Sequence, residues 1–128
     1  KYMKILLSIK PKFVEKIEKG EKKYEFRRIL PKKEGIDRIV VYASSPICKV
    51  VGEIEIDRIL VDNVENLWRK TGKMSGLSYD EFIRYFDGKD RANAFKIKRF
   101  IPYQTPKTLK EIYPDKVAPQ SFCYVDKF

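Results

Sequence analysis

The sequence predicts an α+β fold, in which a small twisted sheet of five to six strands closes into a barrel and three short helices pack on its outside. Segments with the patterns of strands outnumber helical ones and cluster in the middle of the chain. Gly52, near the start of the longest alternating segment, is typical of a bulge or a barrel corner. The 128 residues contain no linker, repeat or low-complexity tract, so we expect a single domain over 1–128.

The first half of the chain combines one helix with four strands. An apolar run precedes Pro11, which suits the first turn of a helix, and Gly20 stands where a C-terminal cap would be. An alternating segment follows and ends at Pro31. A β-branched run then predicts an interior strand, and a long alternating segment predicts another. The expected strands are residues 3–9, 22–30, 38–43 and 49–60.

The second half begins with two helices. Asp62 with Glu65 is an N-terminal capping pattern, and Ser78 with Glu81 is a capping box. A further strand ends where prolines interrupt the chain, one helical turn follows, and a last strand closes the order. We expect these elements at residues 91–101, 108–112 and 121–125.

Composition excludes several kinds of chemistry. The chain has no histidine, which removes His-based acid–base catalysis and imidazole metal sites. Cys48 and Cys123 cannot form a four-cysteine zinc site, and such sparse cysteine use indicates a reducing compartment. No apolar run approaches the ~20 residues of a membrane span, and the first residues lack the cleavage region of a signal peptide. We therefore expect a cytoplasmic protein with no membrane association.

The chain is strongly basic. Lys and Arg number 28 and Asp and Glu 18, a net charge of +10. Residues 10–33 hold ten basic and four acidic side chains, which is +6 of that total. A local basic cluster is typical of a nucleic-acid or phosphate binder. The alternative is a Lys- and Glu-rich composition of the kind found in hyperthermophile proteins, which needs no ligand.

The most specific motif is Gly20-x-Lys22-x-x-Glu25-x-Arg27, between the first helix and the next strand. With it, the sequence resembles the ASCH domain family, a branch of the PUA-like β-barrels. Further segments share the resemblance, which spans most of the chain: LSIKP at 7–11, VGEIEI at 51–56, Trp68, and APQSF at 118–122.

The resemblance implies a PUA-like barrel with a cleft beside the first helix, RNA or nucleotide-like ligands, and a role in RNA metabolism or its regulation. Some branches are enzymes. One deacylates modified cytidines with the motif lysine, a threonine and a distant glutamate. Lys22 matches that lysine, whereas Glu25 stands at the threonine position and residues 74–77 offer no glutamate. Other branches are linked to RNA cleavage.

The motif residues also have a physical interpretation. Lys22 follows the Gly20 turn and can present a charge to a phosphate, or act as a base if burial lowers its pKa. The alternative is a solvated lysine at a strand edge. Glu25 and Arg27 lie two apart on one strand face, where they form either a structural ion pair or a ligand site with a bidentate guanidinium. Strict alternation places Lys22 on the opposite face, so one cleft can hold all three only if the strand starts irregularly.

Other candidate ligand residues lie at strand ends, which often surround a barrel's binding mouth. They are Ser8, Lys10, Ser44, Gln120 and Ser121. Tyr42, Tyr103 and Tyr124 are weaker candidates for a base-stacking surface, whereas Trp68, Phe82, Phe86 and Phe95 are expected in the core.

The carboxylate row Glu53, Glu55 and Asp57 is expected to be a solvated face, because neighbouring same-face residues on a flat strand seldom converge on one ion. We therefore expect no metal and no cofactor. The leading hypothesis is an RNA- or nucleotide-binding domain with its ligand in the cleft. The alternative is a small hydrolase acting on RNA or a modified nucleoside, with Lys22 and Glu25 as catalytic residues. The sequence leaves the oligomeric state open.

Overall fold

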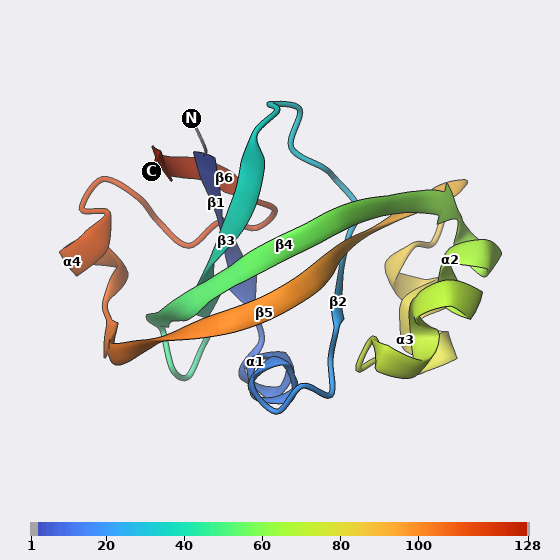
Figure 1. Cartoon of the computed structure of the whole chain (residues 1–128), viewed down its shortest axis with the longest axis horizontal. Coiled ribbons are helices and arrows are strands. Elements are labelled where there is room, and N and C mark those ends of the chain that lie inside the picture. The colour runs from blue at the N-terminus through green and yellow to red at the C-terminus, as the bar shows by residue number, and fades with distance from the viewer. Residues whose placement is uncertain (1–2, 128) are drawn as a thin grey trace.

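The fold is organised around one six-stranded sheet with the strand order β2-β5-β4-β3-β1-β6 (Figure 1). The computed structural model describes residues 3–127. Its strands are β1 (Met3–Ile9), β2 (Tyr24–Arg27), β3 (Ile36–Ala43), β4 (Lys49–Asn63), β5 (Arg91–Lys107) and β6 (Cys123–Lys127). Its helices are α1 (Pro11–Glu18), α2 (Val64–Thr71), α3 (Tyr79–Tyr85) and α4 (Leu109–Ile112), with a 3-10 turn, η1, at Gly72–Met74.

The α+β class is as predicted, but the expectation of a closed barrel is wrong. Strands β2 and β6 are the two edges of an open sheet. A closed barrel would need β2 to pair with β1. Strand β1 has no free edge for this, because it pairs with β3 in parallel on one side and with β6 antiparallel on the other. The sheet therefore stays open, and the Arg27 side chain of β2 reaches the Ser8 carbonyl of β1.

Both faces of the inner strands are covered, which explains why β1 is a continuous apolar run. Its alternate residues Ile5, Leu7 and Ile9 pack with Val14 and Ile17 of α1. The opposite face belongs to a smaller cluster under α4. That cluster contains Leu6, Val40, Val50 and Tyr113. In Figure 1, α1 lies below β5, and α4 lies at the left, at the opposite end of the view from α2 and α3.

A third apolar cluster fixes α2 and α3 at the far end of β4 and β5. Trp68 of α2 packs on Phe82 of α3 with ring centroids 5.1 Å apart, and Phe26 of β2 meets Phe82 edge-on at 4.8 Å. The Ser78–Glu81 capping box is confirmed. The start of α2 differs by one residue, since Asn63 is the N-cap. This cluster ties β2 to the two helices.

Two further predictions differ from the structure. Four helices replace the predicted three, because the expected turn at 108–112 is α4, with its own capping box. Strand β5 continues past Pro102 and Pro106 to Lys107. Pro102 pairs with Gly52 of β4, and β5 is an edge strand along this stretch because β2 has ended, which is where a sheet tolerates proline.

Gly52 marks a bulge, as predicted, and the register of both neighbouring pairings shifts beside it. A Cβ atom at this position would lie 2.5 Å from the carbonyl oxygen of Ile101, so only glycine fits. Over residues 3–127, no helix is long and apolar enough to cross a membrane.

Candidate functional site

A cleft of about 470 Å³ lies between α1, β2 and α3. Basic side chains dominate its lining, six against two acidic ones. The basic residues are Lys10, Lys12, Lys22, Arg27, Arg28 and Arg84. Glu25 and Glu81 are the acidic ones. The volume is within the range of small-ligand sites, roughly 300–1,000 Å³.

Lys22 is placed on the floor of this cleft by the turn after α1. Gly20 adopts a φ of +76°, which reverses the chain, and the Lys22 backbone N–H then donates to the Lys16 carbonyl at 3.1 Å. The side chain runs inward, and the residue is 2% exposed. Its ammonium lies 5.0 Å from the centroid of the Phe13 ring and 5.7 Å from that of Phe26. The alternative of a solvated edge lysine is therefore wrong.

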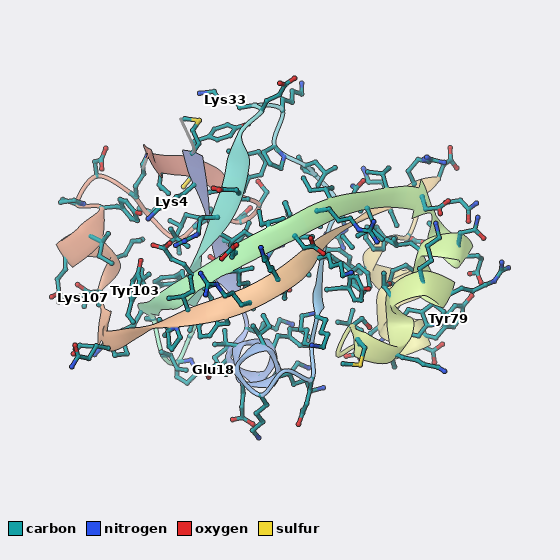
Figure 2. The ribbon with its side chains drawn as sticks, viewed as in Figure 1. Lys4, Glu18, Lys33, Tyr79, Tyr103 and Lys107 are labelled. Carbon is teal, nitrogen blue, oxygen red and sulfur yellow. The ribbon has the colours of Figure 1, made fainter. Side chains whose placement is uncertain are left out.

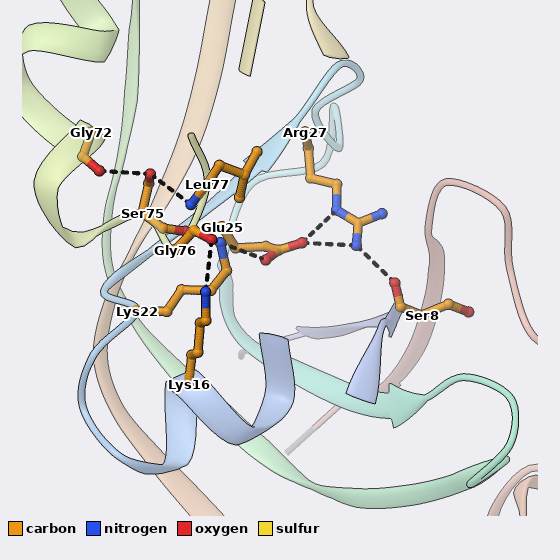
Figure 3. A network of polar contacts seen from close by, with 9 residues as sticks. All are labelled: Ser8, Lys16, Lys22, Glu25, Arg27, Gly72, Ser75, Gly76 and Leu77. Atoms are coloured by element: carbon orange, nitrogen blue, oxygen red, sulfur yellow. Dashed lines mark hydrogen bonds and ion pairs between the residues drawn. The ribbon is translucent and has the colours of Figure 1, made fainter. Parts of the chain in front are cut away.

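Lys16 and Lys22 hold the segment that follows η1 by hydrogen bonds to its backbone (Figure 3). Lys22 Nζ donates to the Ser75 carbonyl at 2.5 Å, and Lys16 Nζ donates to the Gly76 carbonyl at 3.2 Å. Gly76 has a φ of +78°, and a Cβ there would lie 3.3 Å from Lys22 Cδ. Lys22 thus fixes the chain that leads into α3 and borders the cleft.

Glu25 joins the cations of Lys22 and Arg27. Its Oε1 lies 3.6 Å from Lys22 Nζ, and its Oε2 accepts from Arg27 Nη2 at 3.0 Å and Nε at 3.2 Å. Arg27 continues across the gap to β1, where Nη2 donates to the Ser8 carbonyl at 2.9 Å, and Nη1 reaches the Ser121 carbonyl at 3.3 Å. The irregular start of β2 brings Lys22 to the same side as Glu25. The structural ion pair considered from the sequence is present and lines the cleft.

Burial lowers the pKa of Lys22, and the nearby Arg27 and Lys16 cations act in the same direction. Glu25 opposes the shift, because a carboxylate close to the ammonium favours its charged form. A lysine of this kind is poised to exchange a proton more readily than one in water.

The remaining candidates from the sequence divide into two groups. Ser8, Lys10 and Gln120 line the cleft. The Ser8 hydroxyl is engaged in a hydrogen bond to the Pro119 carbonyl at 2.9 Å. Ser44 and Ser121 do not line it, although the Ser121 carbonyl holds Arg27. Ser44 instead has its backbone N–H bonded to the Ile9 carbonyl at the end of β1.

Arg84 and Tyr85 were missed as candidates, and Lys12 and Arg28 were counted only as part of the basic segment. All four line the cleft. Arg84 and Tyr85 belong to α3, some 60 residues from the motif in sequence, so no local pattern indicates their position. Glu81 also lies on α3 and forms part of the capping box. Its carboxylate accepts a hydrogen bond from the Ser78 backbone N–H, and this bond lowers the pKa of Glu81.

The other expected surfaces lie outside the cleft. Tyr42 and Tyr103 pack with the cluster under α4, and the Tyr124 hydroxyl accepts the backbone N–H groups of Lys32 and Lys33. Lys4 and Tyr103 lie over the sheet in Figure 2, where both hydrogen-bond to Glu53.

The predicted carboxylate row is not simply a solvated face. Glu53 is 6% exposed and also accepts from Arg38 at 3.0 Å. Glu55 pairs with Arg99 at 2.7 Å, and Asp57 with Lys96 at 3.5 Å. Ion pairing with basic side chains thus accounts for all three carboxylates. Among the described residues, no group of three or more acidic or cysteine side chains could hold a metal ion.

These features define a small basic α+β domain with a ligand-sized cleft floored by a Lys–Glu–Arg network. The family described as "Domain of unknown function (DUF365)" matches residues 3–120. The ASCH domain-containing ribonuclease of Zymomonas mobilis is 32% identical over 124 residues, which cover 95% of this chain and 84% of that protein. The chain belongs to the ASCH domain family.

The fold supports this assignment. The crystal structure of a mutant of the Zymomonas mobilis ASCH protein matches with a TM-score of 0.86 and 31% identity, covering 97% of this chain and 89% of that one.

Large ribosomal subunit protein uL22 of Ureaplasma parvum is 38% identical over 88 residues. Those residues make up 69% of this chain, which spans only 28% of the length of that relative.

Proposed function

We propose that this chain binds RNA in the cleft between α1, β2 and α3. The observation that carries the proposal is the charge of that cleft, six basic side chains against two acidic ones. A positively charged groove that follows the phosphate backbone is the common basis of RNA binding without strong sequence preference. The name of the Zymomonas mobilis relative, a ribonuclease, points to the same ligand class.

The pairing of these charges strengthens the argument. Both acidic residues of the cleft are already engaged, Glu25 with Arg27 and Lys22, and Glu81 with the N-terminus of α3 and, at 4.0 Å, with Lys12. Among the residues whose side chains the structure describes, none places a carboxylate within ion-pair distance of Lys10, Arg28 or Arg84, although Arg84 lies near enough to Glu81 to help lower the pKa of that carboxyl. These exposed cations are available for phosphate groups.

The test is the salt dependence of binding to a labelled single-stranded RNA. Each phosphate contact contributes about −0.7 to the slope of log affinity against log salt concentration. Lys12→Gln and Arg84→Gln should each weaken binding and flatten the slope by about that amount. Lys19→Gln is the matched control, because Lys19 pairs with Glu15 outside the cleft. No affinity at low salt would refute the proposal and leave composition as the explanation of the charge.

RNA cleavage is the second candidate, and the buried Lys22–Glu25 contact favours it. With its pKa lowered by burial, Lys22 can take the proton of a ribose 2′-hydroxyl. The 2′-oxygen then attacks the adjacent phosphorus, the bond to the 5′-oxygen breaks, and that oxygen takes a proton from water, so the products are a 2′,3′-cyclic phosphate and a 5′-hydroxyl. In this mechanism Arg27, which lines the same cleft, contributes positive charge that stabilises the developing charge on the phosphate oxygens.

This candidate predicts cleavage that survives chelation of divalent metal ions and requires the 2′-hydroxyl. Lys22→Met should abolish it while leaving most of the RNA affinity, because the rim cations Lys10, Arg28 and Arg84 remain. A 2′-O-methyl RNA should bind and stay intact. Cleavage by Lys22→Met at the wild-type rate would exclude Lys22 as the base.

A further inference from the structure

An arginine–tyrosine stack lies at the rim of the cleft, apart from the Lys22–Glu25–Arg27 network. The Cζ atom of Arg28 lies over the Tyr85 ring, 4.2 Å from its centroid. Its Nε donates to the Tyr85 backbone carbonyl. Both side chains line the cleft. One guanidinium is thus held by two different contacts to the same residue of α3.

The stack is built on fixed parts of the fold. The Arg28 carbonyl accepts a hydrogen bond from Asn93 Nδ2 of β5 at 3.3 Å. The half-buried Tyr85 ring packs edge-on against Phe86 with centroids 4.9 Å apart, and Phe86 is 1% exposed. A planar guanidinium held in this way has less conformational entropy to lose when a ligand binds.

Arg28 differs from its neighbour Arg27 in its exposure and in the pairing of its charge. Arg27 is half-buried and its charge is paired with Glu25 at 3.0 Å. Arg28 is exposed and, among the described side chains, has no carboxylate partner. Its plane and its charge are therefore available to a ligand in the cleft.

We propose that Arg28, supported by Tyr85, is a stacking platform for one unpaired nucleobase. The inference rests on the proposed function and adds to it the class of RNA. Bases of single strands stack on aromatic rings and on guanidinium planes, whereas bases inside an A-form helix are not accessible in this way. The platform therefore selects single-stranded RNA, and it prefers adenine to uracil because a purine covers more of the guanidinium plane.

The test compares two polyanions that differ only in their bases. One probe is a labelled 2′-O-methyl oligoadenylate, which resists cleavage through the 2′-oxygen. The other is a 2′-O-methyl abasic chain of equal length, with the same phosphates and no bases. Base stacking contributes roughly 1–3 kcal/mol per base, so Arg28→Lys, which keeps the charge and removes the plane, should weaken oligoadenylate binding about fivefold or more. Binding of the abasic chain should not change.

Two further variants complete the experiment. Arg58→Lys is the matched control, an exposed arginine of β4 that does not line the cleft. It should leave both affinities as in the wild type. Tyr85→Leu removes the ring beneath Arg28 and should reproduce the base-dependent loss. Thermal melts of each variant establish that it is folded before binding is measured.

The outcomes separate the platform from the proposed function. If Arg28→Lys weakens both probes equally, Arg28 is a phosphate contact, and the platform is refuted while RNA binding stands. If Arg28→Lys changes neither affinity, the platform is refuted in the same way. If the wild type binds neither probe, the proposed function fails, and the platform fails with it.

Discussion

Glu25→Gln should destabilise the protein strongly, because Glu25 is the anion shared by the buried Lys22 and the half-buried Arg27. Its Oε1 is 3.6 Å from Lys22 Nζ and its Oε2 is 3.0 Å from Arg27 Nη2. The side chains of Lys22, Glu25 and Arg27 are 1%, 9% and 13% exposed, so solvent screens these charges weakly. The substitution keeps the shape of the side chain and removes the charge. Two cations then lie close together without compensation.

The expected loss follows from the burial of the network. Removing one partner of a buried ion pair costs about 3–5 kcal/mol. The entropy of unfolding is about 2.1 cal/mol/K per residue, or about 0.27 kcal/mol/K for this chain, so the melting temperature should fall by about 11–19 °C. Thermal unfolding followed by circular dichroism measures this fall. Chemical denaturation gives the free energy of unfolding independently.

Two companion variants make the result specific. Glu15→Gln removes an exposed carboxylate that pairs with Lys19 at 3.2 Å on α1, and it should change the melting temperature little. Lys22→Met added to Glu25→Gln removes one of the two uncompensated cations and should recover part of the lost stability. If Glu25→Gln has the same melting temperature as the wild type, the network is well solvated and the reasoning from burial is wrong.

Two pH dependences should also be measurable. Because burial lowers the pKa of Lys22, the unfolded chain binds more protons between that lowered pKa and the ordinary lysine value of 10.5, and stability should rise with pH in this window. Urea unfolding of Lys22→Met should lack this rise, and an unchanged pH profile would contradict a buried ammonium. Burial would raise the pKa of Glu53, but hydrogen bonds from Lys4, Tyr103 and Arg38 outweigh it and lower the pKa. The stabilisation is therefore present above the ordinary value of 4.5 and is lost as the pH falls through the lower folded pKa, so Glu53→Gln should remove that part of the acid sensitivity. Equal acid sensitivity in the two proteins would show that Glu53 is not the group responsible.

The extent of β5 shows why local signals can mislead. Pro102 and Pro106 predict the end of a strand, because proline cannot donate to a ladder. The rule applies to central strands and is relaxed in an edge strand. At this end of the sheet β2 has already stopped, so β5 has only β4 as a neighbour and continues to Lys107.

The sequence by itself determined features that depend on neighbouring residues. Gly20 with its positive φ, the Ser78–Glu81 capping box and the bulge at Gly52 all follow from residue types at short spacing. The spacing of Glu25 and Arg27 indicated that the two share a strand face, and the structure pairs them at 3.0 Å. The resemblance to the ASCH domain family, based on the motif around Lys22 together with further segments along the chain, is also confirmed.

The tertiary structure decided what depends on distant parts of the chain. The sheet stays open because β6, from the other end of the sequence, occupies the second edge of β1. Lys22 is buried because the Ser75 carbonyl, 53 residues away, accepts a hydrogen bond from its ammonium, which lies beside the rings of Phe13 and Phe26. Arg28 becomes a platform only where α3 places Tyr85 beneath it. Local patterns fix the geometry of a turn or cap, whereas strand edges, burial and clefts are set by which distant segments compete for the same surface.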